Sequence, residues 1–236
     1  MRNVSRKHEG HRLAQLNEIV YQVGNYDAMA LAMTLGLDDY FRREYTKFLN
    51  NTREKFLRIL DVGCGTGRNV PYILSKYKDV NIVLVDISFS SLKIALEKYR
   101  GSTNIDYVCC SAELMCLREG SIDNVLSSYM LRHVDIAKFV RELKFITHRF
   151  SRIVIVDFWR SHVAISMMLL ILHLAIIVPF LSLVFSPRSF CAYVNLWKFL
   201  PNLPDPIGIC KVFSRLGNVK MLSFYNMIYV WVIQRG

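Results

Sequence analysis

The sequence predicts an α/β fold built around a mostly parallel sheet. Short apolar runs alternate with amphipathic stretches of helical period from about residue 56 to residue 157, which is typical of parallel strands joined by right-handed crossovers. Near the carboxyl end, two alternating runs flank Tyr225-Asn226, and this pattern predicts a tight antiparallel hairpin. The last strand of the sheet should therefore run against the others.

Each element can be assigned in order along the chain. Two lead-in helices are expected from Leu13 to about Leu49, with a break at Gly24-Asn25. The expected parallel strands are Phe56–Asp61, Asn81–Asp86, Ile105–Cys109, Ser121–Ser128 and Arg152–Asp157. The helices between them are expected at Thr66–Tyr77, Ser90–Tyr99 and Ile136–His148. The closing hairpin should pair Val219–Tyr225 with Met227–Ile233.

Composition sets further bounds. With 236 residues, 53% of them hydrophobic, the chain can form a core without disulfides or metals. Its 30 Lys and Arg exceed its 19 Asp and Glu, and this balance favours anionic partners. The six cysteines contain no C-x-x-C pair, which predicts buried free thiols in a reducing compartment and no metal site. The basic amino terminus lacks the apolar core of a secretory signal, so a cytoplasmic protein is expected.

A glycine-rich loop is the most informative motif. The apolar strand that ends in Asp61 leads directly into Gly63, Gly65 and Gly67 and then into a predicted helix. Glycines there let a ligand approach the main chain, and the helix offers unpaired N–H groups. Asp86 ends the next strand about 20 residues later, where a carboxylate can accept hydrogen bonds from two ribose hydroxyls.

Two ligands compete for this loop. A dinucleotide site has the pattern G-x-G-x-x-G, whereas an S-adenosylmethionine site has D-x-G-x-G-x-G. Position 68, where the third dinucleotide glycine would fall, is Arg68. Asp61, two residues before the first glycine, would repel a pyrophosphate and suits a cationic donor. The loop thus resembles the first motif of class I methyltransferases, which implies a seven-stranded Rossmann-like sheet.

Three further segments resemble the ubiquinone and menaquinone biosynthesis C-methyltransferases. Tyr26-Asp27-Ala28-Met29 is similar to their opening segment, and Ser111-Ala112-Glu113 falls where the family contacts adenine. The stretch from Ser128 to Val134, SYMLRHV, resembles the family's S-F-G-L-R-N-V. The resemblance extends from about Tyr26 to Arg235, and Ala30, Ser111 and His133 depart from the family pattern.

This resemblance implies a set of site residues. The donor-binding residues are expected to be Asp61, Gly63, Gly65, Thr66, Gly67, Asp86, Ser111, Ala112 and Ser128. The expected catalytic residues are Arg132, His133 and Tyr26. C-methylation of a quinol needs a phenolic proton removed, so Arg132 could stabilise the phenolate or order a water, and His133 could act as base. Tyr26 could contact the donor or close the pocket. The alternative is that Arg132 pairs with a nearby acid while His133 packs.

An uncharged apolar segment, Val163–Phe185, separates the fifth strand from the closing hairpin. At about 1.5 Å per residue it could cross a bilayer core of about 30 Å. A single crossing would nevertheless place the hairpin across the membrane from its own sheet. Val178-Pro179 predicts a break, and hence a bent cap over the site that suits an isoprenoid tail. A buried core helix and a homodimer interface remain alternatives.

A methyltransferase domain is expected at 51–236, and the lead-in helices at 1–50 are expected to be part of the same domain. The cap would belong to an insertion in this domain at about residues 161–206. Its outer face could lie in the membrane interface. Basic side chains could then meet acidic headgroups, namely those of Lys76, Lys78, Arg188, Lys198, Lys211 and the amino terminus. A cytoplasmic protein attached peripherally to an anionic membrane surface is therefore expected.

The expected function is S-adenosylmethionine-dependent C-methylation of a prenylated quinol. Another hydrophobic or lipid-like acceptor remains open, because the departures at Ala30, Ser111 and His133 all lie within the matching motifs. Nucleic acid is not an expected partner, since Ser128-Tyr129-Met130-Leu131 stands where such enzymes carry a polar residue, Pro-Pro and an aromatic.

Overall fold

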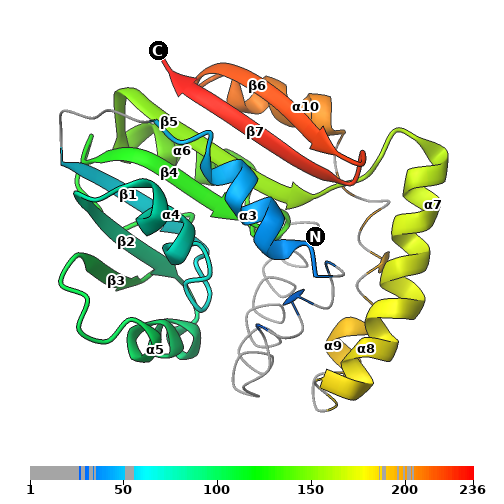
Figure 1. The fold of residues 1–236 in the computed structure, drawn as a ribbon. Coiled ribbons are helices and arrows are strands. Elements are labelled where there is room, and N and C mark those ends of the chain that lie inside the picture. Colours follow the sequence, from blue (N-terminus) through cyan, green and yellow to red (C-terminus); the bar gives the residue numbers. More distant parts are fainter. Residues whose placement is uncertain are drawn as a thin grey trace, which may run out of the picture.

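The computed structural model describes residues 27, 30, 31, 34, 36–50, 56–185, 187, 190–195, 197, 198, 200, 203 and 205–236. A seven-stranded sheet with the order β3-β2-β1-β4-β5-β7-β6 forms its centre (Figure 1). The strands are β1 Leu57–Val62, β2 Val80–Asp86, β3 Ile105–Cys109, β4 Ile122–Ser128, β5 Thr147–Phe158, β6 Gly217–Phe224 and β7 Ile228–Arg235. Strands β1 to β5 are parallel, and β7 runs antiparallel to both β5 and β6. The predicted fold class is confirmed.

Helices cover both faces of the sheet. On one face lie α3 Asp38–Thr46, α4 Val70–Lys76 and α5 Phe89–Lys98. On the other lie α6 Ile136–Ile146 and α10 Pro206–Phe213. Each face buries its own apolar core against the β-branched residues of the strands. These two layers fix the carboxyl ends of the five parallel strands along one edge.

The predicted start of α4 and the predicted junction between α6 and β5 are wrong. Helix α4 begins at Val70 rather than Thr66, because Gly67 has a left-handed φ of 74° and the chain is still turning there. Helix α6 ends at Ile146, and β5 begins at the next residue, five residues before the predicted start. The polar residues at that start hid the strand. Among the predicted lead-in helices, the structure describes only α3 as a regular helix; residues 13–23 lie outside the described residues.

The closing hairpin confirms its predicted turn. Tyr225 and Asn226 both have positive φ, 54° and 55°, and Met227 N donates to Phe224 O at 3.1 Å. Two left-handed central residues define the turn type whose twist matches the flanking strands. Strand β7 is thereby returned to pair with β5.

The predicted break at Val178-Pro179 is wrong. A single helical rod runs from α7 Ala164–Leu172 through a π-helical turn, η2 His173–Ile177, into α8 Val178–Phe185. Val178 N donates to His173 O, one residue further back than in an α-helix. This wider turn just before Pro179 lets the chain accommodate the proline, which lacks an N–H, without ending the helix.

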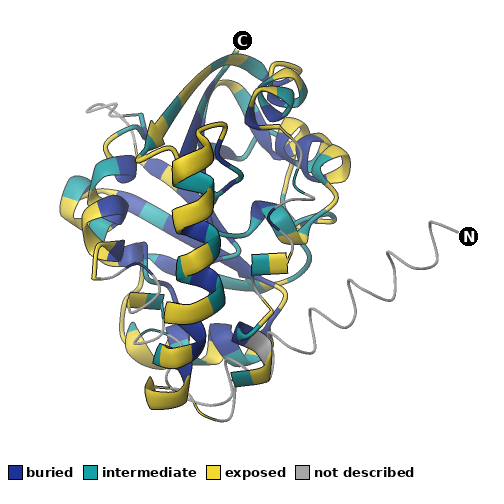
Figure 2. Cartoon of the chain, turned by 90° about the vertical axis from the view of Figure 1, so that its right-hand side faces the viewer, coloured by how far each residue is buried: buried dark blue, intermediate teal, exposed yellow. Residues whose placement is uncertain are grey.

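The rod has one buried and one exposed apolar face. Leu170, Leu174 and Val178 pack with Tyr193 and Leu200 into a third core, separate from those of the sheet. Tyr193 belongs to a short helix, α9 Phe190–Tyr193. The opposite face is exposed along its length (Figure 2) and carries a helical stripe of Ile165, Met168, Leu169, Leu172, Ile176, Phe180, Leu183 and Val184. By length and composition, residues 164–185 form a helix that could cross a membrane.

The six cysteines are free thiols, but their predicted burial is only partly correct. Cys64, within the glycine loop, is buried, whereas Cys109, Cys116 and Cys191 are exposed. Cys109 is exposed because it ends β3, which forms one edge of the sheet.

Candidate functional site

The glycine loop crosses the carboxyl ends of β1 and β2 and is packed on both sides. Gly63 has a φ of 67°, and a Cβ atom there would lie 2.6 Å from Cγ of Met130. Gly67 has a φ of 74°, and a Cβ atom there would lie 2.8 Å from Cε2 of Tyr99. Both positions require glycine for conformation and for space. The loop is therefore held between the end of β4 and helix α5.

Asp86 fastens this loop to the end of β2. Its Oδ2 accepts a hydrogen bond from Gly65 N at 2.8 Å, and its Oδ1 accepts one from Ser88 N at 2.8 Å. The residue is only 8% exposed. These two bonds orient the carboxylate, which can accept about four hydrogen bonds when it is ionised. This arrangement suits the predicted contact with ribose hydroxyls.

The predicted adenine-side residues follow the neighbouring strand. Cys110 N donates to Asp86 O at 3.1 Å and extends the pairing of β3 with β2. Ser111 and Ala112 come next and are half-buried. Ser111 Oγ accepts from Glu113 N at 3.1 Å, which forms a local turn. The residues predicted to bind adenine and ribose thus lie on adjacent strand ends.

Asp61 supplies the test of whether the site fits S-adenosylmethionine. Its side chain is fully buried, and Oδ1 accepts from Nδ2 of Asn69 at 2.9 Å. Oδ2 is buried without a hydrogen-bond partner among the described residues. Burial raises the pKa of Asp61 to about 7, against the opposing effects of Asn69 and Arg42. A buried acceptor of this kind suits a ligand that brings a cationic N–H donor, such as the ammonium group of S-adenosylmethionine.

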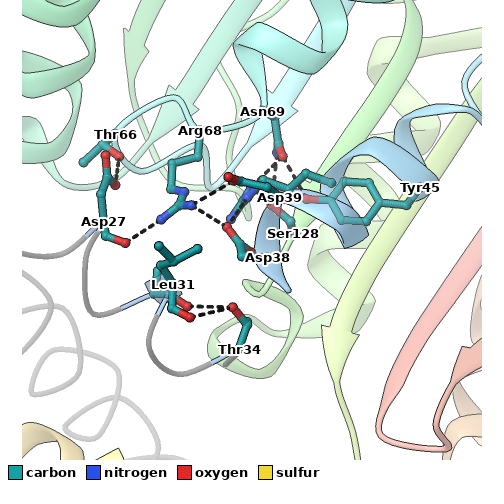
Figure 3. Close-up of polar contacts among 12 residues, drawn as sticks. Asp27, Leu31, Thr34, Asp38, Asp39, Tyr45, Thr66, Arg68, Asn69 and Ser128 are labelled. Atoms are coloured by element: carbon teal, nitrogen blue, oxygen red, sulfur yellow. Dashed lines mark hydrogen bonds and ion pairs between the residues drawn. The ribbon is translucent and has the colours of Figure 1, made fainter. Parts of the chain in front are cut away.

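Thr66 contacts the amino-terminal part of the chain. Its Oγ1 donates to Oδ1 of Asp27 at 2.6 Å, and Arg68 Nη1 donates to Asp27 O at 2.6 Å (Figure 3). Lys98 on α5 adds an ion pair to the same carboxylate at 3.2 Å. Asp27 therefore lies over the glycine loop. Tyr26, the predicted catalytic tyrosine next to it, lies outside the described residues.

Ser128 belongs to a buried polar network that joins α3 to the glycine loop. Its Oγ accepts from Nη1 of Arg42 at 3.3 Å and from Nδ2 of Asn69 at 3.0 Å. The same network contains Asp38 and Tyr45 of α3, as Figure 3 shows. Ser128 thus helps to orient side chains at the end of β4, whether or not its hydroxyl also reaches the donor.

Arg132 pairs with a buried acid. Arg132 Nη1 and Asp157 Oδ1 form a short ion pair, and Arg132 N donates to Asp157 Oδ2 at 3.4 Å. Asp157 is fully buried near the end of β5, and burial raises its pKa while Arg132 opposes that shift. The side chain of Arg132 keeps 13% exposure. The alternative that Arg132 pairs with a nearby acid is therefore correct as geometry, and it leaves the arginine at the functional edge.

His133 lies at the surface of the one-turn 3₁₀ helix η1 Leu131–His133. Although the residue as a whole is exposed, desolvation of its ring lowers the pKa to about 3, and the positive charge of Arg132 adds to this. The imidazole is therefore neutral at neutral pH. It can accept a hydrogen bond, but its low pKa makes it a weak base.

Tyr129, which sequence reasoning did not assign to the site, is conformationally strained. Its φ is 62°, uncommon for a residue with a side chain, and such strain clusters at functional sites. The ring stacks on Phe158 with centroids 5.2 Å apart, and the guanidinium of Arg42 lies 5.6 Å from its centre. Its hydroxyl is buried without a hydrogen-bond partner among the described residues. Tyr129 therefore links β4, β5 and α3 at this edge.

The structure brings the residues predicted to bind the methyl donor together at the carboxyl ends of β1 to β4. Arg132 lies at the same edge of the sheet, beside the end of β5. Sequence reasoning missed Asp157, Arg42 and Asn69. A signal for Asp157 was present, since it lies within one residue of the end of an apolar parallel strand, as Asp61 and Asp86 do. Strand-end acids at this edge commonly face ligands.

Comparison with known proteins also indicates a methyltransferase domain. Residues 60–155 match the family described as "Methyltransferase domain". The ubiquinone/menaquinone biosynthesis C-methyltransferase UbiE of Desulfotalea psychrophila is 28% identical over 117 residues, which cover 50% of this chain and 46% of the relative. A malonyl-[acyl-carrier protein] O-methyltransferase of Marinomonas sp. is 31% identical over 74 residues, 31% of this chain and 27% of the relative. The matches thus span less than half of either relative.

A solved structure extends the likeness of the fold. The crystal structure of an S-adenosylmethionine-dependent methyltransferase from Aquifex aeolicus superposes with a TM-score of 0.58 at 14% identity, covering 82% of this chain and 88% of that one. The sheet order, the glycine loop and these matches together show that the chain contains a class I S-adenosylmethionine-dependent methyltransferase domain that resembles the ubiquinone and menaquinone C-methyltransferases.

Proposed function

We propose that the chain transfers a methyl group from S-adenosylmethionine to a ring carbon of a prenylated quinol. The observation that carries this proposal is the position of Arg132, which Asp157 holds at the same edge as the donor loop. A fixed cation beside the methyl donor suits an acceptor that becomes an anion as it reacts. The similarity to UbiE supports the quinol as that acceptor.

The donor supplies an electrophilic methyl group, and the side chains present account for the remaining tasks. The acceptor hydroxyl must lose its proton so that the ring carbon becomes nucleophilic, and the ring hydrogen leaves as a proton after the new carbon–carbon bond forms. Arg132 would lower the pKa of that hydroxyl by favouring its anion. His133, neutral next to this charge, would accept the hydrogen bond of the hydroxyl or of a water.

A second candidate is methylation of another hydrophobic acceptor. The similarity to a malonyl-[acyl-carrier protein] O-methyltransferase, at 31% identity over 74 residues, favours an acceptor other than a quinol. An acceptor carboxylate is already anionic and needs no base. Arg132 would then bind the acceptor rather than assist loss of a proton.

We further propose that this protein is cytoplasmic and attaches peripherally to membranes through the rod of α7, η2 and α8. Together with α9 and its surroundings, the rod would form the cap insertion of a single domain. β5 and the β6–β7 hairpin flank it and pair in one sheet, so a single crossing is incompatible with the fold. Its exposed apolar stripe fits an orientation parallel to the surface.

The predicted headgroup contact of Lys76 is wrong. Its Nζ donates to the carbonyl oxygen of Thr46, the last residue of α3, at 3.2 Å. It also donates to those of Lys47 and Leu49, just after the helix, at 3.0 and 2.8 Å. Lys76 therefore anchors α3 to α4. Lys78, Lys198 and Lys211 are exposed and remain candidates, whereas Arg188 lies outside the described residues.

Membrane attachment is tested by sedimentation with liposomes. The wild-type protein should sediment with anionic liposomes at low salt, and Leu172→Glu together with Ile176→Glu should abolish this. Leu96→Glu, an equally exposed apolar position on α5, is the matched control. Binding that survives the double substitution would contradict the proposed orientation. Two results together would favour a homodimer interface on the rod: the wild-type protein fails to bind liposomes, and the double substitution converts a dimer into a monomer.

The proposed reaction is tested by transfer of labelled methyl groups into a total lipid extract from the source cells, followed by mass analysis of the product. Label on a quinol ring carbon is the expected result. Label on a carboxylate or on another lipid would favour the second candidate. Arg132→Gln should remove most of the transfer to a quinol, since it deletes the fixed cation.

A further inference from the structure

The buried face of α3 carries charge where a helix normally carries apolar residues. Asp38, Arg42 and Tyr45 are buried together with Phe41, at the spacing of one helical face. Arg42 Nε donates to Oδ2 of Asp38 at 2.6 Å, and Arg68 Nη2 lies 2.8 Å from the same oxygen. A buried arginine of this kind needs a specific set of partners, because desolvation of a charge is costly.

Those partners lead directly to the donor loop. Arg42 Nη1 donates to Oδ1 of Asn69 at 2.5 Å and to the hydroxyl of Tyr45 at 3.2 Å. Asn69 lies at the end of the glycine loop and is only 1% exposed. Figure 3 shows Asn69 and Ser128 meeting the side chains of α3 at this point.

Arg42 fixes which way the amide of Asn69 points. Asn69 Oδ1 accepts from both Arg42 and Tyr45, and Nδ2 donates to Ser128 Oγ at 3.0 Å and to Asp61 Oδ1 at 2.9 Å. All of the amide's hydrogen-bonding capacity is used. A flipped amide would direct its NH₂ group at the guanidinium, so the donor end must face Asp61.

The charges around Asp61 give Arg42 a second effect. The groups that face Asp61 are Arg42 on α3, Asn69 and Cys64 on the loop, Asp86 on β2, Tyr45 on α3 and Tyr99 after α5. Arg42 favours the charged carboxylate, whereas burial and Asp86 disfavour it. Losing Arg42 would therefore leave Asp61 both misoriented and more readily protonated.

We propose that Arg42 is a positioning residue for the methyl donor: through Asn69 it holds Asp61 as an oriented carboxylate, whose second oxygen receives the ammonium group of the donor. This inference rests on the proposed use of S-adenosylmethionine. The second oxygen is the buried Oδ2, which has no hydrogen-bond partner among the residues that the structure describes. Arg42 itself does not touch the donor.

The test compares two ligands that differ in the amino-acid part, which carries the ammonium group. S-adenosylhomocysteine carries the ammonium group, and 5′-methylthioadenosine lacks the whole amino-acid part. Their dissociation constants are measured by calorimetry for the wild type, Arg42→Met, Arg42→Lys and Arg43→Met. Arg43 is the matched control, because it is the exposed neighbour on the same helix. Thermal unfolding of each variant identifies the folded proteins that can be compared.

The expected result is selective. An opposite charge at close range shifts a carboxylate pKa by about 1 to 3 units. A shift of about one unit from a value near 7 lowers the charged fraction of Asp61 at pH 7 about fivefold. Arg42→Met should therefore bind S-adenosylhomocysteine at least about fivefold more weakly and 5′-methylthioadenosine as the wild type does. Arg43→Met should change neither.

The pH profile separates positioning from a merely structural role. Wild-type affinity for S-adenosylhomocysteine should rise through about pH 7 as Asp61 ionises, and Asp61→Asn should remove this rise. Arg42→Met should move the rise upward by about one pH unit. Arg42→Lys, which keeps the charge, should leave it near the wild-type position. The ligand's own amino group titrates alike in every variant.

Three outcomes decide the matter. Equal weakening of both ligands by Arg42→Met, or an unshifted pH profile, would overturn the positioning role. Should Arg42→Met not fold, an Asp61→Asn protein that binds S-adenosylhomocysteine with wild-type affinity and wild-type pH dependence would overturn it. A wild-type protein that binds neither ligand would instead refute the proposed donor, and that failure is distinguishable because it does not depend on any variant.

Discussion

Replacing Asp157 by asparagine should damage methyl transfer and leave donor binding intact. Asp157 is fully buried, and its partner Arg132 keeps only 13% exposure. Removing one member of a buried ion pair costs about 3 to 5 kcal/mol, because the remaining charge stays buried without compensation. Asparagine keeps an oxygen that can accept from Arg132, so we expect the lower value, a loss of about 3 kcal/mol in the free energy of unfolding.

The catalytic effect follows from the orientation of Arg132. Asp157 accepts from both the guanidinium and the main-chain N–H of Arg132, so it fixes the side chain at two points. A misplacement of about 1 Å in such a group can lower the rate about 100-fold. We therefore expect kcat to fall about 100-fold in Asp157→Asn, with the dissociation constant of S-adenosylhomocysteine within twofold of wild type.

The assay combines urea unfolding, calorimetry with S-adenosylhomocysteine and methyl transfer to the acceptor identified from the lipid extract. Asp123→Asn is the matched control, since Asp123 pairs with His148 at 3.1 Å at the opposite end of β4. That partly exposed pair should contribute about 1 kcal/mol or less and nothing to turnover. If Asp157→Asn lost stability but kept its kcat, Arg132 would be a structural residue. A parallel loss of donor affinity would place Asp157 in the donor site instead.

The remaining predictions concern the donor half of the site. Gly63→Ala should lower both stability and donor affinity more than Gly101→Ala, since Gly101 also has a positive φ, 90°, but no atom lies within 4 Å of a Cβ built there; circular dichroism melts and calorimetry measure the difference. Asp86→Ala should weaken S-adenosylhomocysteine binding at least about tenfold and also lower the melting temperature, because it removes the expected ribose acceptor together with the hydrogen bonds from Gly65 N and Ser88 N; unchanged affinity of the folded variant would refute our ribose assignment. The folded pKa of Asp61 is raised, so the free energy of unfolding should fall as pH rises from about 4 to about 7, and Asp61→Asn should flatten part of that fall in urea titrations.

The donor half was predictable because its signals are local. Asp61, Gly63 and Asp86 lie on strand ends that apolar runs mark clearly, and the left-handed turns of the loop require glycine whatever the rest of the fold does. The Tyr225-Asn226 turn was predictable for the same reason. The start of α4 and the polar beginning of β5 were not predictable. The turn of the glycine loop decides where α4 begins, and pairing with β4 decides where β5 begins.

The network of Arg42 was not predictable because its contacts are long-range. Asn69 lies 27 residues from Arg42, and Ser128 lies 86 residues away. In the sequence, Asp38 and Arg42 read as an ordinary i, i+4 pair on a helix surface. One feature could have raised suspicion: the pair shares its helical face with Phe41 and Tyr45, which favours burial of that face.

The rod at residues 164–185 shows how topology overrides composition. Its length and apolar content satisfy a membrane span, yet β5 before it and β7 after it are hydrogen-bonded neighbours from Arg152↔Gln234 to Phe158↔Ile228. Pulling the rod across a bilayer would break that pairing, which buries the core of both faces. The rod therefore stays beside the sheet, where Leu170, Leu174 and Val178 pack against apolar residues, whereas the opposite stripe is exposed in the part of the chain that the structure describes. An exposed apolar stripe of this length marks an interaction surface, and the proposed contact with a bilayer surface would cover it without moving β5 or β7.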